Sequence, residues 1–178
     1  MIKLIVQEFQ WVRGKEDDPE DKCAHGRVLF QVNDTIFVKP DDVWTVTTSA
    51  LYLLRTITEN HTIEDPVSET NFLFPCCGFI VWPAGERFEV LCMGCCNGVD
   101  VEIIHHQGMV MVKSPAGSEE VSESEWTAAV LGFVNSVQAF YDTSAPKVDI
   151  KDEFDRQGWE AFWQEWEKRY QKALSLLE

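Results

Sequence analysis

Two long stretches in the last third of the chain have apolar residues at a helical period, and this pattern most constrains the fold. In the first stretch the apolar side chains are spaced by four, three, four and three residues, at Trp126, Val130, Phe133, Val137 and Phe140. Such spacing places all of them on one face of an α-helix. Ser122 and Glu125 have the spacing of a capping box. A helix is therefore predicted from Ser122 to the Ala145-Pro146 pair.

The second stretch predicts a C-terminal helix from about Asp152 to Leu177. Its apolar stripe is rich in aromatic residues, which can serve as core or as a partner-binding groove. Core packing explains the stripe with fewer assumptions. Its members are Trp159, Trp163, Trp166, Tyr170, Leu174 and Leu177.

The earlier part of the chain has short β-prone runs separated by turn residues, with one helix predicted from Thr47 or Thr48 to about Asn60. Asn97-Gly98 is the strongest hairpin signal, and Asn33-Asp34 and Gln107-Gly108 predict further turns. Pro83-Ala84-Gly85 is expected to separate two strands. The predicted strands cover 1–12, 28–32, 35–39, 71–82, 87–96, 99–106 and 109–113.

This order of elements predicts an α+β fold in a single domain spanning residues 1–178. We expect an antiparallel β-sheet of about six strands, packed by three helices of which the last two are C-terminal.

The charge of the chain limits its partners. The sequence has 30 acidic residues against 15 basic ones, for a net charge of −15. Nucleic acid and anionic membranes are bound through basic patches, so neither is an expected partner. A basic protein is the partner that this charge favours. The apolar runs are too short for a membrane span, and the N-terminus does not have the pattern of a signal peptide, so a cytoplasmic location is expected.

The cysteines are the first candidates for chemistry. In a cytoplasmic protein the six cysteines are expected to be reduced thiols. Neighbouring residues of a strand point to opposite faces, so neither Cys76-Cys77 nor Cys95-Cys96 is expected to bridge internally. Cys92 and Cys95 form one C-x-x-C, and a zinc site could combine them with Cys76 or Cys77 and His105. Only one such pair is present, and buried packing of small apolar side chains is the competing interpretation.

No complete catalytic set is found in the sequence, and the protein is expected not to be an enzyme. The sequence has no P-loop, no G-x-G-x-x-G, no H-E-x-x-H and no G-x-S-x-G. The carboxylates are interpreted either as a solvated face or as an acidic docking surface. The regions expected to contact a partner are 16–21, 149–160 and the exposed side of the last helix, with candidate residues Asp152, Glu153, Asp155, Glu160 and Glu165.

Three stretches of the sequence carry a resemblance. They are Thr48–Thr56, then Pro75-Cys76-Cys77-Gly78 with Cys95–Asp100 and His105, and then Glu153-Phe154-Asp155 with Gly158–Trp166. In these three stretches and in its overall build, the chain resembles small bacterial immunity proteins of polymorphic-toxin and contact-dependent inhibition systems. The resemblance implies a cytoplasmic protein that binds and blocks a co-produced toxin domain, often a basic nuclease. It assigns no role to any single residue.

Two functional hypotheses follow, with a weaker third. The first is a non-enzymatic immunity protein that neutralises a basic toxin. The second is a zinc- or thiol-dependent protein built on Cys76, Cys77, Cys92 and Cys95, without any other cofactor. The third is a homo-oligomer that uses exposed tryptophans.

Overall fold

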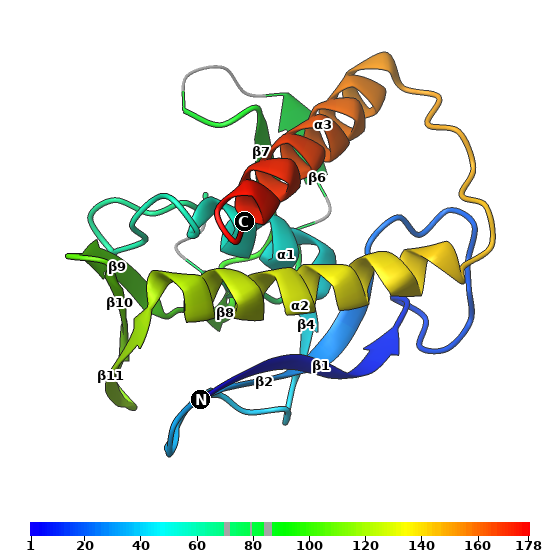
Figure 1. Cartoon of the computed structure of the whole chain (residues 1–178). Coiled ribbons are helices and arrows are strands. Elements are labelled where there is room, and N and C mark those ends of the chain that lie inside the picture. The colour runs from blue at the N-terminus through cyan, green and yellow to red at the C-terminus, as the bar shows by residue number, and fades with distance from the viewer. Residues whose placement is uncertain (70–71, 79, 84–86) are drawn as a thin grey trace.

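The predicted α+β class is confirmed by the structure, a computed structural model that describes residues 1–69, 72–78, 80–83 and 87–178 (Figure 1). These residues form three helices, and the last two are C-terminal. All strand pairs are antiparallel, but they are divided among four sheets instead of one. One hydrophobic core includes residues from all three helices.

The first sheet contains β1 (Ile2–Gln10), β2 (His25–Val32), β3 (Thr35–Val38) and β4 (Val43–Thr45). Alternate residues of β2 are buried, as expected for a sheet with only one face on the core. The Asn33-Asp34 turn is confirmed, because Val32 pairs directly with Thr35 and Asn33 has a φ of 50°. The sequence did not predict β4, which pairs with the first residues of β2.

The first helix, α1 (Val46–Arg55), is buried over all ten of its residues. It is therefore a central core helix and not an amphipathic one. The predicted start of this helix at Thr47 or Thr48 was wrong, since the N-cap residue is Thr45, whose side chain makes no capping bond. Thr47 lies inside the helix, and its hydroxyl accepts a hydrogen bond from the Ala24 backbone N–H at 2.8 Å.

The predicted strand 71–82 is split into β5 (Phe74–Pro75) and β6 (Ile80–Pro83), and strand 87–96 is reduced to β7 (Val90–Met93). The Asn97-Gly98 hairpin prediction was wrong, because Gly98 belongs to β8 (Gly98–Val99), which pairs with β5. A long-range pairing thus replaces the local turn. Asn71, and Ala84 and Gly85 of the predicted turn, lie outside the described residues.

A three-stranded sheet, β9 (Glu102–His106), β10 (Met109–Ser114) and β11 (Gly117–Ser122), lies at the end of the molecule where α2 begins (Figure 1). The Gln107-Gly108 turn between β9 and β10 is confirmed, with φ values of 48° and 79°. The sequence did not predict β11, whose single fully buried side chain, Val121, gives no apolar alternation.

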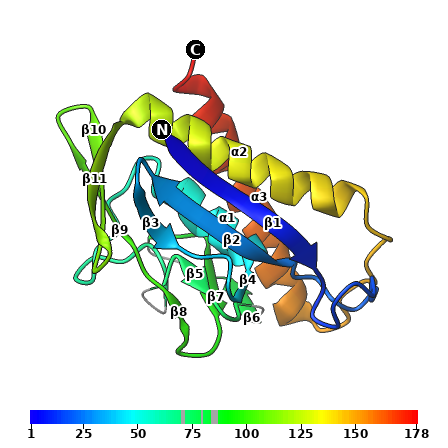
Figure 2. The same cartoon turned by 90° about the horizontal axis from the view of Figure 1, so that it is seen from below.

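The second helix, α2 (Glu123–Asp142), confirms both its predicted stripe and its capping box. It runs beside β1 (Figure 2), and Phe140 stacks on Phe9 with ring centroids 4.7 Å apart.

The third helix, α3 (Glu153–Ser175), is rotated relative to its predicted stripe. Its buried residues are Gly158, Phe162, Glu165, Trp166 and Ala173, whereas Leu174 and Leu177 are exposed. The rotation places Gly158 against β6, so closely that a Cβ added there would lie 1.9 Å from the Val81 carbonyl oxygen.

We expect Gly158→Ala to destabilise the protein by about 1–3 kcal/mol, because the added methyl group forces α3 away from β6. Gly132→Ala in α2 is the matched control, since no neighbouring atom lies within 4 Å of the added Cβ. That change should stabilise the protein by up to about 1 kcal/mol through helix propensity. Urea unfolding followed by tryptophan fluorescence measures both. Equal effects of the two substitutions would contradict the close packing of α3 on β6.

Candidate functional site

Three cysteine side chains converge beside the first sheet. The Sγ atoms of Cys76, Cys77 and Cys95 all lie within 4.8 Å of one another. Cys76 and Cys77 follow β5, and Cys95 follows β7, so the cluster joins two segments that are distant in the sequence.

An interruption in the strand pairing brings the three thiols together. Pro75 pairs with Gly98 and Ile80 pairs with Met93 in one continuous antiparallel register, but the described residues between these pairs are not in strand conformation. The rule that adjacent side chains point to opposite faces applies to regular strands, so it does not hold here. The two segments also approach closely, since a Cβ on Gly94 would lie 2.0 Å from the Cys77 carbonyl oxygen.

Buried threonines at the start of α1 fix the position of the first cysteine segment. The Thr45 hydroxyl donates to the carbonyl oxygen of Cys76 at 3.0 Å, and the Thr48 hydroxyl donates to that of Gly78 at 2.9 Å. Both threonines are almost fully buried. The cysteine segment is therefore anchored to the core helix.

Hydrogen bonds make Cys95 the most acidic thiol of the cluster. The pKa of Cys95 is lowered mainly by a hydrogen bond from the Cys77 thiol to its sulfur. The Cys76 thiol and the backbone N–H groups of Asn97 and Cys77 act in the same direction. Burial raises the pKa of Cys76 and that of Cys77. Cys95 is thus the cluster member most readily converted to a thiolate.

The cluster borders a cavity of about 710 Å³, whose wall includes Cys76, Cys77, His25, Asp155 and Trp159. Burial lowers the pKa of His25, which favours its neutral form. The Nδ1 atom of His25 is buried and has no hydrogen-bond partner among the described residues. The wall of the cavity therefore includes a neutral imidazole ring as well as two cysteines.

Two of the predicted metal ligands lie outside the cluster. Cys92 is buried in β7, and burial raises the pKa of its thiol well above the ordinary value. His105 lies on β9, where its Nε2 is 2.8 Å from the carbonyl oxygen of Thr56. The structure therefore brings Cys76, Cys77 and Cys95 together and leaves out the C-x-x-C pairing of Cys92 with Cys95.

The candidate partner-binding carboxylates have mostly local roles. Asp152 is the N-cap of α3 and accepts from the backbone N–H groups of Phe154 and Asp155. Glu153 and Glu160 both form ion pairs with Arg156. Asp155 is exposed at the cavity wall.

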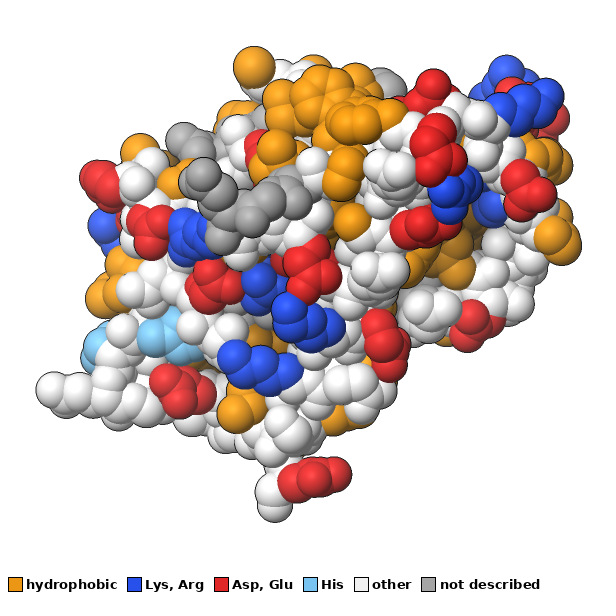
Figure 3. All heavy atoms as spheres, turned by 90° about the horizontal axis from the view of Figure 1, so that it is seen from above, with side chains coloured by type: hydrophobic (Ala, Val, Ile, Leu, Met, Phe, Trp, Pro, Cys, Tyr) orange, Lys and Arg blue, Asp and Glu red, His pale blue; other side chains and the backbone are white. Residues whose placement is uncertain are grey.

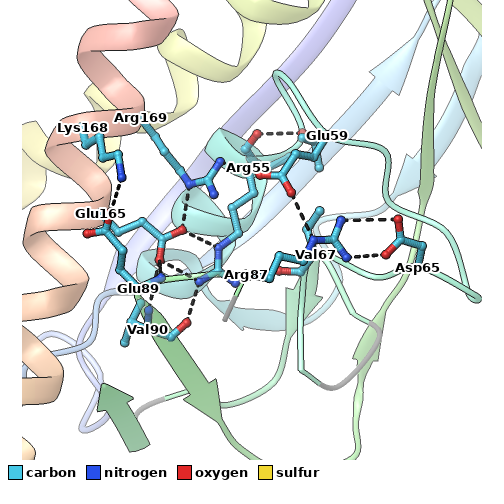
Figure 4. Close-up of polar contacts among 12 residues, drawn as sticks. Arg55, Glu59, Asp65, Val67, Arg87, Glu89, Val90, Glu165, Lys168 and Arg169 are labelled. Atoms are coloured by element: carbon cyan, nitrogen blue, oxygen red, sulfur yellow. Dashed lines mark hydrogen bonds and ion pairs between the residues drawn. The ribbon is translucent and has the colours of Figure 1, made fainter. Parts of the chain in front are cut away.

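Glu165 differs from the expectation, because its side chain is only 2% exposed and lies in the core. Its Oε1 accepts from Nε of Arg55 at 2.8 Å, and Arg55 is fully buried (Figure 4). Burial alone would raise the pKa of Glu165, but the hydrogen bonds and charges of Arg55 and Arg169 together outweigh burial and hold that pKa below its ordinary value. This carboxylate is not available to a partner at the surface.

Further ion pairs extend this network outward to the surface (Figure 4). Arg169 donates to Glu165 at 2.7 Å and to Glu59 at 2.9 Å, and Arg87 pairs with Glu59 and Asp65. Acidic and basic side chains are accordingly interspersed on the face seen in Figure 3. Sequence reasoning did not identify Arg55 as a key residue. The available signal was that it is the one charged residue in the segment 43–58.

His61 lies at the start of a polar loop, but its side chain is fully buried. Its Nδ1 accepts from the Val67 backbone N–H at 3.0 Å, so a neutral ring carries its proton on Nε2, which lies 2.7 Å from Asp100. These contacts assign His61 a structural role in holding the loop 62–67.

Comparisons of the chain with protein-family models, with curated proteins and with solved structures found no match. Within the described ranges, no helix combines the length and the apolar character needed to cross a bilayer.

We expect Glu165→Gln to destabilise the protein by about 3 kcal/mol near neutral pH, because it leaves Arg55 buried without its anionic partner. The pKa of Glu165 is depressed in the folded state, so its contribution is fully present above the ordinary value of 4.5 and is lost as pH falls through the folded pKa. The difference in unfolding free energy between wild type and variant should therefore shrink below pH 4.5.

Urea unfolding at a series of pH values measures this difference. Glu167→Gln is the matched control, because Glu167 is exposed on the same helix and bonds only to Gln171 at 2.9 Å among the described residues. A difference for Glu165→Gln that is small or independent of pH would contradict the buried ion pair.

Proposed function

We propose that the protein is a non-enzymatic cytoplasmic binding protein that neutralises a basic protein partner, as an immunity protein does with its cognate toxin domain. The net charge of −15 supports this, because opposite charge speeds the association of two proteins. The buried polar residues Arg55, Glu165 and His61 have structural partners, which also favours a binding role over a catalytic one.

The observation that carries the proposal is the distribution of carboxylates over residues 98–125, which include β9, β10 and β11. This segment contains one basic side chain, Lys113. Its acidic residues are Asp100, Glu102, Glu119, Glu120, Glu123 and Glu125. It is therefore strongly negative, although its histidines add positive charge when they are protonated.

The outer face of this sheet has the composition of a protein interface. Ile104 and Met111 are cross-strand partners with half-buried side chains, and they form an apolar centre. Around them lie Glu120, which pairs with Met111 in the register, and Glu102, which forms an ion pair with Lys113 at 2.9 Å. An apolar centre with a charged rim is the usual anatomy of a binding surface.

The first part of α3 is a weaker candidate for the contact. Arg156 neutralises Glu153 and Glu160, and Asp152 is engaged as the helix cap. Carboxylates of the β9–β11 face are paired as well, for example Glu102 with Lys113. We place the main contact on that face because it adds the apolar centre formed by Ile104 and Met111.

We expect the purified protein to bind a basic toxin domain encoded beside it, with a salt-sensitive association rate. Glu102→Gln/Glu120→Gln should lower the association rate constant by about tenfold, since charges at the rim act mainly on this rate. Glu153→Gln/Glu160→Gln is the matched control and should change it little. Surface plasmon resonance at several salt concentrations measures both variants.

Failure of the protein to bind any basic product of the neighbouring genes would overturn the proposed function. Binding that is unaffected by the β9–β11 variant but weakened by the α3 variant would instead move the contact to α3.

A further inference from the structure

We propose that Cys76, Cys77 and Cys95 bind one thiophilic metal ion, zinc, through three thiolates. This inference does not rest on the proposed function, since the cysteine cluster shares no residue with the β9–β11 face. Its three ligands differ from the C-x-x-C pair of Cys92 and Cys95, because they include Cys95 but not Cys92.

The separation of the sulfur atoms fits such a site. A zinc–thiolate bond of about 2.3 Å in tetrahedral geometry places the ligand sulfurs about 3.8 Å apart. The three Sγ atoms already lie within 4.8 Å of one another, so small rotations of the side chains complete the site.

The surrounding backbone orients one of the three thiols. The Cys95 N–H donates to the Sγ of Cys77 at 2.9 Å. Hydrogen bonds to a ligand fix its orientation toward a bound metal. The site is thus partly organised before an ion arrives.

Packing of cysteine as a small apolar residue does not account for the cluster. Cys23 and Cys92 are of that kind, since both are buried and burial raises the pKa of each thiol. In contrast, Cys95 is exposed, and Cys76 and Cys77 are half-buried. The strand pairing is interrupted where these three thiols meet, although the same register continues on both sides.

Three protein ligands leave one coordination position of a tetrahedral zinc ion open. Cys76 and Cys77 line the cavity of about 710 Å³, so water or a small ligand can reach that position. The site therefore fits an accessible metal centre better than a closed structural one.

The test uses the full chain, reduced and freed of metal. Native mass spectrometry with zinc should show one ion per chain. Titration with Co²⁺ should produce the absorption of tetrahedral thiolate coordination. Cys95→Ser and Cys77→Ser should each weaken zinc binding by more than about 100-fold, because loss of outer-shell partners alone costs 10- to 100-fold.

Cys96→Ser is the matched control, since Cys96 is an exposed neighbour outside the cluster, and it should bind zinc as the wild type does. Near-ultraviolet circular dichroism shows whether each variant is folded. Three outcomes overturn the proposal: a reduced wild type that binds no zinc, equal loss of binding in Cys96→Ser, or retained stoichiometry in Cys76→Ser/Cys77→Ser/Cys95→Ser.

Discussion

The buried guanidinium of Arg55 is the interaction on which the rest of the structure depends. It donates to Glu165 of α3, to the carbonyl oxygen of Val67 in the loop before β5, and to that of Val90 in β7. The guanidinium carbon lies 3.9 Å from the centroid of the Phe88 ring, and a further ion pair joins Arg55 to Glu69. Removing a charge from water costs several kcal/mol, so each of these partners is needed to offset the burial. Three segments that are distant from one another in the sequence are thereby held around one side chain of α1.

The cysteine cluster depends on this arrangement through α3 and α1. Arg55 fixes the middle of α3 at Glu165, and Gly158 brings the first part of that helix onto β6. As a result, Asp155 and Trp159 form part of the cavity wall beside Cys76 and Cys77. The opposite end of α1 holds the cysteine segment through Thr45 and Thr48. A substitution of Arg55 is therefore expected to alter the wall of the cavity, although the two sites share no residue.

Local patterns in the sequence were sufficient for part of the fold. The capping box at Ser122, the stripe of α2 and the Gln107-Gly108 turn were predicted because each depends on residues a few positions apart. Asn97-Gly98 was mispredicted because pairing of Gly98 with Pro75 decides its conformation. Glu165 was placed at the surface because its partner, Arg55, lies 110 residues away in the sequence. The thiol cluster could not be predicted for the same reason, since Cys77 and Cys95 come together only through the register of two strands distant in the sequence. The spacing of residues within either strand does not indicate this contact.

The large negative charge connects the two proposals physically. The core does not carry this net charge, because buried Glu165 is paired with buried Arg55. In the ion-pair network around them, acidic and basic side chains alternate. The net charge of −15 must therefore be carried by the surface, where it acts at a distance. Such a field raises the local concentration of any cation, whether a basic protein approaching the β9–β11 face or a divalent ion approaching the cavity beside Asp155 and Asp21. Long-range attraction is thus common to both proposals, and short-range chemistry separates them. Thiols select a soft metal ion. An apolar centre with a charged rim selects a protein.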